Sequence, residues 1–163
     1  MTDLEDLAQA LVTQMTQKEK MIATAESCTG GLIAAAITQI AGSSAVLDRG
    51  FVAYSNQAKQ EMIGVSEETL TSFGAVSQQT AIEMAEGALA RSNADLTVSV
   101  TGIAGPGGGS ELKPVGLVHM AVARSDGETV HSELLFGDIG RSAVRQATVF
   151  AALKALLKEA DTF

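Results

Sequence analysis

The sequence of 163 residues has few aromatic side chains, a single cysteine and two prolines. With one Tyr, five Phe and no Trp, it lacks the stacking platforms that hold single-stranded nucleic acid. Lys and Arg number 11 against 19 Asp and Glu, and the formal net charge of −8 argues against nucleic acid as a partner, because phosphate contacts need basic residues. The lone Cys28 excludes an internal disulfide and is typical of a reducing compartment.

The sequence also lacks an apolar run long enough to span a bilayer. Its first residues include Asp3, Glu5 and Asp6 rather than a basic stretch followed by an apolar one, so we expect no signal peptide. These absences favour a cytoplasmic protein that does not bind membranes. There is no Cys/His cluster and the carboxylates are scattered, so we expect neither a metal nor a cofactor.

The sequence does contain apolar segments with helix and strand periodicity. Leu4, Leu7 and Leu11 recur at helical spacing, and Thr2 with Glu5 has the form of a capping box. Strands are predicted over residues 21–25, 46–54, 96–100, 116–123 and 129–136. Further helical segments are predicted over residues 32–40, 56–63, 67–72, 77–91 and 140–159, with Ser77 as an N-cap.

The order of these segments indicates the fold class. Strands alternate with helices, and the last two strands are joined by the hairpin signal Ser125-Asp126-Gly127. This pattern predicts an α/β protein with one domain over residues 1–163. We expect a three-layer α/β/α sandwich with a mixed, mostly parallel sheet.

In such sheets, ligands bind beyond the carboxyl ends of the strands, and the loop from Glu26 to Gly31 has this position. Ser27 and Thr29 supply hydroxyl groups. The free amides at the start of the next helix can bind an anion, or can form an oxyanion hole beside a Ser27 nucleophile. The alternative is structural, with Ser27 or Thr29 as a helix cap. Cys28 ranks below Ser27 as a nucleophile because no histidine pairs with it.

A second candidate loop follows the strand at 96–100. The segment from Thr101 to Gly109 is rich in glycine, which lets a backbone approach a ligand closely and exposes its amides. It has neither the Lys-Ser/Thr of a Walker loop nor the spacing of a dinucleotide fingerprint. A flexible surface loop is the alternative, but two such loops at strand ends favour a shared pocket.

A serine nucleophile needs a base, and neither histidine is well placed. His119 and His131 fall in the two hairpin strands, so we assign them structural or surface roles. Lys is the usual substitute for His. A Ser-x-x-Lys match from Ser110 to Lys113 lies in the glycine/proline loop rather than at a helix start, and we interpret it as a chance match.

Four other polar residues are candidates for the site. Tyr54 is the only tyrosine and ends a predicted strand, and Lys59 follows about one helical turn later. Arg141 and Arg145 are spaced i, i+4, so they share a helix face that could bind a phosphate. For Lys59 and for the two arginines, solvated side chains are the alternative.

Five separated segments together resemble the CinA C-terminal domain family, in order and over nearly the whole chain. They are Ala25–Gly31, Tyr54-Ser55-Asn56 with Lys59, Thr101–Gly108, Lys113–Gly116, and Gly140-Arg141 through Val144-Arg145. The resemblance implies a three-layer α/β/α sandwich. Stand-alone members of the family are nicotinamide-nucleotide amidases, which hydrolyse nicotinamide mononucleotide to nicotinate mononucleotide and ammonia.

The resemblance also implies roles for particular residues. Ser27 matches the nucleophile, and Tyr54 and Lys59 match its partners. A small-molecule nucleotide is the implied substrate, and its binding residues are expected among Cys28, Thr29, Gly30, Gly31, Thr101, Gly102, Ala104, Gly105, Gly107, Arg141 and Arg145. Many members carry an additional N-terminal domain, whose activity the resemblance does not transfer to this chain.

The mechanism implied for such a site makes one physical demand. Lys59 would take the proton of Ser27, directly or through Tyr54, yet a free lysine has a pKa of about 10.4. A base active near neutrality needs that pKa lowered by roughly 3 units, through burial or a neighbouring cation such as Arg141 or Arg145. Two alternatives stay open: a non-catalytic nucleotide-binding module, and an amidase of the same mechanism with another amide substrate. A homodimer is a further hypothesis, because the Ala-rich helices would tolerate subunit packing.

Overall fold

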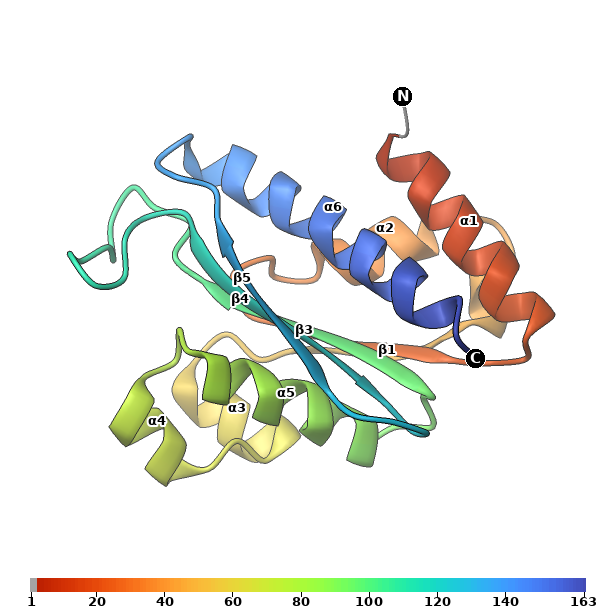
Figure 1. Cartoon of the computed structure of the whole chain (residues 1–163), viewed down its shortest axis with the longest axis horizontal. Coiled ribbons are helices and arrows are strands. Elements are labelled where there is room, and N and C mark those ends of the chain that lie inside the picture. Colours follow the sequence, from red (N-terminus) through yellow and green to blue (C-terminus); the bar gives the residue numbers. More distant parts are fainter. Residues whose placement is uncertain (1–2) are drawn as a thin grey trace.

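The computed structural model describes residues 3–163, which form a five-stranded sheet between two layers of helices (Figure 1). The strands are β1 (Ile22–Glu26), β2 (Leu47–Val52), β3 (Leu96–Gly102), β4 (Leu117–Arg124) and β5 (Val130–Leu135). The helices are α1 (Leu4–Gln17), α2 (Leu32–Thr38), α3 (Asn56–Ile63), α4 (Glu67–Phe73), α5 (Gln78–Ala90) and α6 (Arg141–Ala160), with a 3-10 turn η1 (Ser43–Ala45). The predicted three-layer α/β/α fold is confirmed.

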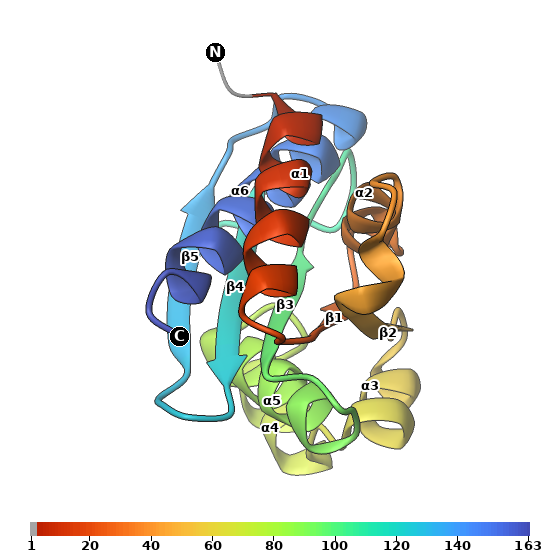
Figure 2. The same cartoon turned by 90° about the vertical axis from the view of Figure 1, so that its right-hand side faces the viewer.

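The sheet has the strand order β2-β1-β3-β4-β5. β1 pairs in parallel with β2 and β3, whereas β4 pairs antiparallel with both β3 and β5. Only β4 therefore runs against the other strands, which confirms a mixed, mostly parallel sheet. Helices α1, α2 and α6 cover one face of the sheet, and α3, α4 and α5 cover the other (Figures 1 and 2).

Some predicted boundaries differ from the structure. The predicted capping box paired Glu5 with Thr2, which lies outside the described residues; in the structure the Asp3 carboxylate caps α1, accepting the N–H of Asp6 at 2.8 Å. β3 continues two residues beyond its predicted end, because Gly102 still pairs with Val118 of β4. The Ser77 N-cap is confirmed, and its hydroxyl accepts the N–H of Thr80 at 3.2 Å.

The longest helix, α6, crosses the sheet and packs against α1 and β3. Its buried face includes Val144, Val149, Leu153 and Leu156, which join the main hydrophobic core. Its first residue, Arg141, lies near the carboxyl ends of the parallel strands, at the end of the molecule where the candidate loops meet. Within residues 3–163, no helix combines the length and the apolar character needed to cross a bilayer.

Helix α5 lies close to the sheet because small side chains face it. Ala81 and Ala85 of the helix pack against Ala121 and Ala123 of β4. Three buried hydroxyls of β3 donate to carbonyls of α5 or of the residues before it: Thr97 to Ala85 at 2.7 Å, Ser99 to Ala81 at 2.5 Å and Thr101 to Ala75 at 2.8 Å. These bonds satisfy hydroxyls that would be costly to bury alone, and they fix the segment before α5 beside the end of β3.

The contact between α5 and α3 needs a glycine. A Cβ on Gly87 of α5 would lie 1.8 Å from the carbonyl oxygen of Ile63 at the end of α3. We therefore expect Gly87→Ala to lower the free energy of unfolding by about 1–3 kcal/mol, as overpacking does, measured by urea denaturation. Gly107→Ala is the matched control, because a Cβ there meets nothing within 4 Å. Equal stability of the two variants would contradict this packing argument.

Candidate active site

A cavity of about 220 Å³ lies where the carboxyl ends of β1, β2 and β3 meet the start of α6. Eight of the predicted site residues line it: Ser27, Cys28, Tyr54, Lys59, Thr101, Gly102, Ala104 and Arg141. Thr29, Gly30, Gly31, Gly105, Gly107 and Arg145 do not. Three lining residues were not predicted: Asn56 belongs to the quoted Tyr54-Ser55-Asn56 motif, whereas Ala75 and Val76, just before the Ser77 cap, carry no sequence signal.

Ser27 and Lys59 form the central polar contact of this cavity. Lys59 Nζ lies 3.0 Å from Ser27 Oγ and also donates to the main-chain carbonyl of Tyr54 at 3.2 Å. Both side chains are buried, Ser27 at 8% exposure and Lys59 at 1%. Ser27 directly follows β1, and Lys59 lies on α3 beyond β2, so the parallel pairing of these neighbouring strands brings the two residues together.

The environment of Lys59 disfavours its charged form. Burial lowers the pKa of Lys59 from its ordinary value, an effect that the nearby Cys28 opposes. Among the described residues, no carboxylate forms an ion pair with Lys59. The alternative of a solvated Lys59 is therefore wrong. Burial, rather than an adjacent arginine, is the main cause of the shift.

The capping alternative for Ser27 is also wrong, because Glu26 fills that role. One Glu26 carboxylate oxygen accepts the Thr29 hydroxyl at 2.6 Å and the N–H of Ile33 at 2.8 Å, and the other accepts the N–H of Ala34 at 3.0 Å. A buried anion at this position satisfies the free amides at the start of α2. The hydroxyl of Ser27 is thus left for Lys59. No pattern in the sequence predicted this role for Glu26.

A tight turn follows the serine. The N–H of Gly30 donates to the carbonyl of Ser27 at 3.1 Å, and Gly30 adopts a positive φ of 58°. The N–H of Ser27 donates to Val100 in β3 at 3.0 Å. The N–H of Gly30 is therefore already used within the turn and does not face a substrate oxyanion. The N–H groups of Cys28 and Thr29 remain as candidates.

The side chain of Cys28 is a poor nucleophile in this environment. Burial raises the pKa of the Cys28 thiol to about 11, although the positive charges of Arg145 and Lys59 act in the opposite direction. The thiol is therefore protonated at neutral pH, and the thiolate is the reactive form of cysteine. This favours Ser27 over Cys28.

Tyr54 and Arg141 form the mouth of the cavity. The Tyr54 side chain is 59% exposed, and its hydroxyl accepts a hydrogen bond from Arg141 Nη2 at 3.1 Å. Arg141 Nη1 donates to the carbonyl of Gly105 at 2.9 Å and so connects the glycine loop to the same rim. Lys59 is contacted by the main-chain carbonyl of Tyr54, whereas the phenol bonds to Arg141.

Arg145, one turn further along α6, contacts a different loop. Its Nε donates to the carbonyl of Cys28 at 3.1 Å and its Nη2 to the carbonyl of Thr29 at 3.2 Å. The two arginines share a helix face, as their spacing predicted. Arg141 reaches the cavity, whereas Arg145 holds the turn after Ser27.

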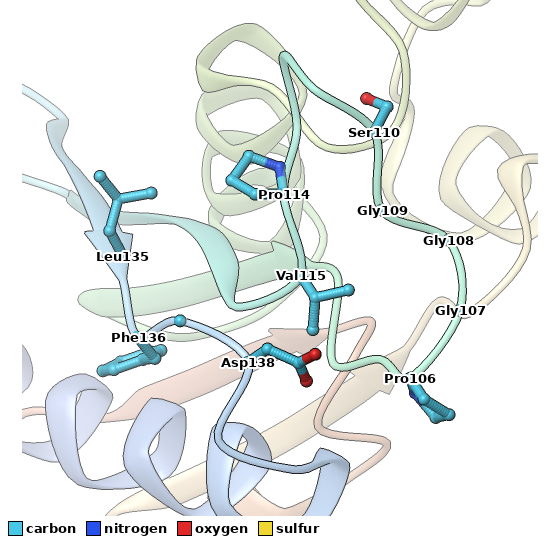
Figure 3. Close-up of a pocket in the computed structure, with 11 residues that line it drawn as sticks. Pro106, Gly107, Gly108, Gly109, Ser110, Pro114, Val115, Leu135, Phe136 and Asp138 are labelled. Atoms are coloured by element: carbon cyan, nitrogen blue, oxygen red, sulfur yellow. The ribbon is translucent and has the colours of Figure 1, made fainter.

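A larger cavity of about 720 Å³ is bordered by the glycine loop and by the residues that end and follow β5 (Figure 3). It is lined by Gly107 and its neighbours together with Val115, Phe136 and Asp138, and it contains neither Ser27 nor Lys59. Ser110 lies here too, but Lys113 Nζ donates to the carbonyl of Phe73 at 2.7 Å. This agrees with the interpretation of the Ser-x-x-Lys match as chance.

The two histidines pair with each other rather than with Ser27 or Lys59. His119 Nδ1 on β4 and His131 Nε2 on β5 lie 2.9 Å apart, and the two rings stack with their centroids 5.1 Å apart. Neither lines the cavity that holds Ser27. Over residues 3–163, no group of three or more His, Cys, Asp or Glu side chains is arranged to hold a metal ion.

The model of the CinA C-terminal domain family matches residues 4–160. The chain belongs to this family. The nicotinamide-nucleotide amidohydrolase PncC of Enterobacter agglomerans is 54% identical over 155 residues, which are 94% of this chain and 93% of that protein. PncC of Escherichia coli K12 is 53% identical over 93% of each chain. These relatives confirm the prediction that the chain is an amidohydrolase.

Other members of the family differ in length. A putative competence-damage inducible protein of Caldicellulosiruptor bescii is 47% identical over 157 residues, and this chain spans 38% of its length. Among solved structures, the competence/damage inducible protein CihA of Agrobacterium tumefaciens is 59% identical and superposes with a TM-score of 0.95, covering 97% of this chain and 96% of that one. The CinA C-terminal fold thus extends over nearly the whole of this chain.

Proposed function

We propose that this member of the CinA C-terminal domain family hydrolyses the carboxamide of nicotinamide mononucleotide to nicotinate mononucleotide and ammonia, with Ser27 as the nucleophile and Lys59 as its base. The observation that carries the proposal is the 3.0 Å contact between Ser27 Oγ and the buried Lys59 Nζ. The similarity to proteins named nicotinamide-nucleotide amidohydrolase supports the substrate.

The chemistry proceeds in two halves. Neutral Lys59 takes the proton of Ser27 while Oγ attacks the carboxamide carbon, giving a tetrahedral oxyanion that the amides after Ser27 stabilise. Protonated Lys59 then gives its proton to the leaving nitrogen, the C–N bond breaks, and ammonia departs from an acyl-enzyme. Water attacks the ester carbonyl with Lys59 again as the base, and nicotinate mononucleotide and free Ser27 result.

In this scheme Tyr54 orients rather than relays. Lys59 reaches Ser27 directly, and the main-chain carbonyl of Tyr54 holds Nζ in place at 3.2 Å. The phenol contributes to the mouth of the cavity through its bond to Arg141. The proton therefore needs no intermediate carrier between Ser27 and Lys59.

We assign the phosphate of the nucleotide to Arg141. A cavity of about 220 Å³ accommodates the pyridine carboxamide and leaves the rest of the nucleotide towards the mouth. Arg141 is the first residue of the 20-residue helix α6, whose free amides and dipole favour an anion. Two guanidinium N–H groups bond to Gly105 and Tyr54, and a guanidinium has five.

Arg141→Ala is expected to raise KM for nicotinamide mononucleotide by about 10–100-fold, because a hydrogen bond to a charged group contributes about 1.5–3 kcal/mol. KM for free nicotinamide, which has no phosphate, should change far less. Steady-state kinetics with both amides measures the difference, and Arg49→Ala, at an arginine outside the cavity, is the control. An equal rise for both amides would refute the phosphate assignment.

The proposed reaction is tested by the purified protein and nicotinamide mononucleotide, with ammonia and nicotinate mononucleotide quantified separately. The proposal requires the two products in equal amounts. If ammonia is released from other amides but not from this nucleotide, the protein is still an amidohydrolase, but nicotinamide mononucleotide is not its substrate.

A further inference from the structure

The turn that follows Ser27 is held from outside by Arg145. The guanidinium donates to two consecutive carbonyls of the turn, Cys28 at 3.1 Å and Thr29 at 3.2 Å. The mechanism proposed above gives Arg145 no role, and Arg145 does not line the cavity. A half-buried arginine that uses two donors on one loop fixes the orientation of two peptide groups.

The peptide between Cys28 and Thr29 is the one whose orientation matters. It is the central peptide of the turn closed by the bond from Gly30 N–H to Ser27 O. The two common turn types differ by a flip of this central peptide, which exchanges the directions of its carbonyl and its N–H. Thr29 has a negative φ, and the flipped form would need a positive φ at this β-branched residue. Arg145 adds a direct hydrogen bond to the unflipped form.

The orientation of the carbonyl determines the direction of the amide. In a trans peptide the C=O and N–H groups point in opposite directions, so the N–H of Thr29 points away from Arg145. Arg145 belongs to α6, on one face of the sheet, and Lys59 belongs to α3, on the other (Figure 1). The N–H of Thr29 therefore points towards the side from which Lys59 approaches Ser27 Oγ.

We propose that Arg145 is a positioning residue, which holds the peptide between Cys28 and Thr29 so that the N–H of Thr29 stabilises the oxyanion formed on attack by Ser27. This inference rests on Ser27 being the nucleophile of the proposed function. It replaces the phosphate role that the sequence predicted for Arg145. Substrate binding then depends on Arg141, and the rate of the chemical step depends on Arg145.

The kinetic test compares Arg145→Ala, Arg145→Lys and Gln146→Ala, a control at the neighbouring exposed residue of α6. Loss of one oxyanion donor lowers kcat by about 10²–10³-fold. Because the β-branched Thr29 itself disfavours the flipped turn, the donor is only partly lost without Arg145, and we expect Arg145→Ala to lower kcat by about 10–100-fold. KM should stay within about threefold of the wild-type value.

Lysine cannot bridge both carbonyls, so the kcat of Arg145→Lys should lie between those of the wild type and Arg145→Ala. Added guanidinium should partly restore kcat in Arg145→Ala. A raised KM with unchanged kcat would overturn the proposal in favour of phosphate binding.

A second readout separates this inference from the identity of the substrate. A fluorophosphonate probe forms a bond from Ser27 Oγ to phosphorus while fluoride leaves and the serine proton passes to Lys59, and the adduct carries a phosphoryl oxygen where the oxyanion would lie. Labelling of Ser27 that is slower in Arg145→Ala, in a variant with unchanged thermal unfolding, supports the positioning role even if nicotinamide mononucleotide is not hydrolysed. Equal labelling rates in Arg145→Ala and wild type would refute it. If the wild type is not labelled, both the assignment of Ser27 as the nucleophile and the positioning role of Arg145 are refuted.

Discussion

Ser27→Ala is expected to lower kcat for nicotinamide mononucleotide by about 10⁴-fold or more, because the acyl-enzyme cannot form without the hydroxyl. The fold should not change, since the hydroxyl bonds only to Lys59 Nζ and does not cap α2. The measurement is ammonia release with purified variant and wild-type protein, with circular dichroism and thermal unfolding to show that both are folded. Binding of the nucleotide should survive, because the phosphate site at Arg141 is untouched.

Ser110→Ala is the matched control for this variant. Ser110 belongs to the other serine–lysine match of the sequence, but its Lys113 is bonded to the carbonyl of Phe73. If Ser110→Ala turns over substrate at the wild-type rate and Ser27→Ala does not, Ser27 is assigned as the nucleophile. Undiminished ammonia release by Ser27→Ala would show that Ser27 is not the nucleophile, and the buried Cys28 or an activated water would have to take its place.

Lys59→Met is expected to remove turnover almost completely and at the same time to stabilise the fold. The methionine keeps much of the buried volume but has no base to accept the Ser27 proton, so kcat should fall by about 10³-fold or more. Burial lowers the pKa of Lys59, so at neutral pH the fold carries a group whose protonated form is disfavoured. Its replacement by an apolar side chain should raise the free energy of unfolding by about 1 kcal/mol. Ammonia release and urea denaturation give the two measurements, and a variant that is both active and unchanged in stability would contradict both roles of Lys59.

The lowered pKa of Lys59 also predicts how stability and activity depend on pH. The folded state binds fewer protons than the unfolded state between the lowered pKa of Lys59 and the ordinary value of 10.5, so the free energy of unfolding should rise with pH in that window. The neutral amine is the base, so kcat/KM should rise through the lowered pKa, at a pH below 10.5. Lys59→Met should lose this contribution to the rise in stability. A wild-type rate that increases only near pH 10.5 would show that the lysine is not shifted in solution.

The sequence by itself determined the fold class and indicated Ser27 and Lys59 as candidates for the site. Alternating helix and strand periods are local properties of the chain, and they predicted the three-layer arrangement and the antiparallel hairpin. The loop from Glu26 to Gly31 and the pair Tyr54 and Lys59 were recognisable because strand ends and polar motifs can be located in the sequence. Family resemblance then added the partnership of Ser27 with Lys59, which spacing alone could not supply.

Only the tertiary structure decided how the polar groups share their partners. Lys59 could be buried or solvated until the packing of α3 against the sheet placed it at 1% exposure beside Ser27. The sequence offered Ser27 or Thr29 as the cap of α2, whereas the path of the turn in three dimensions gives that role to Glu26. Arg141 and Arg145 have the same local pattern, yet one reaches the cavity and the other reaches the carbonyls of Cys28 and Thr29. The physical reason is that burial and hydrogen-bond partners are set by segments distant in sequence, so periodicity can predict an element but not the groups packed against it.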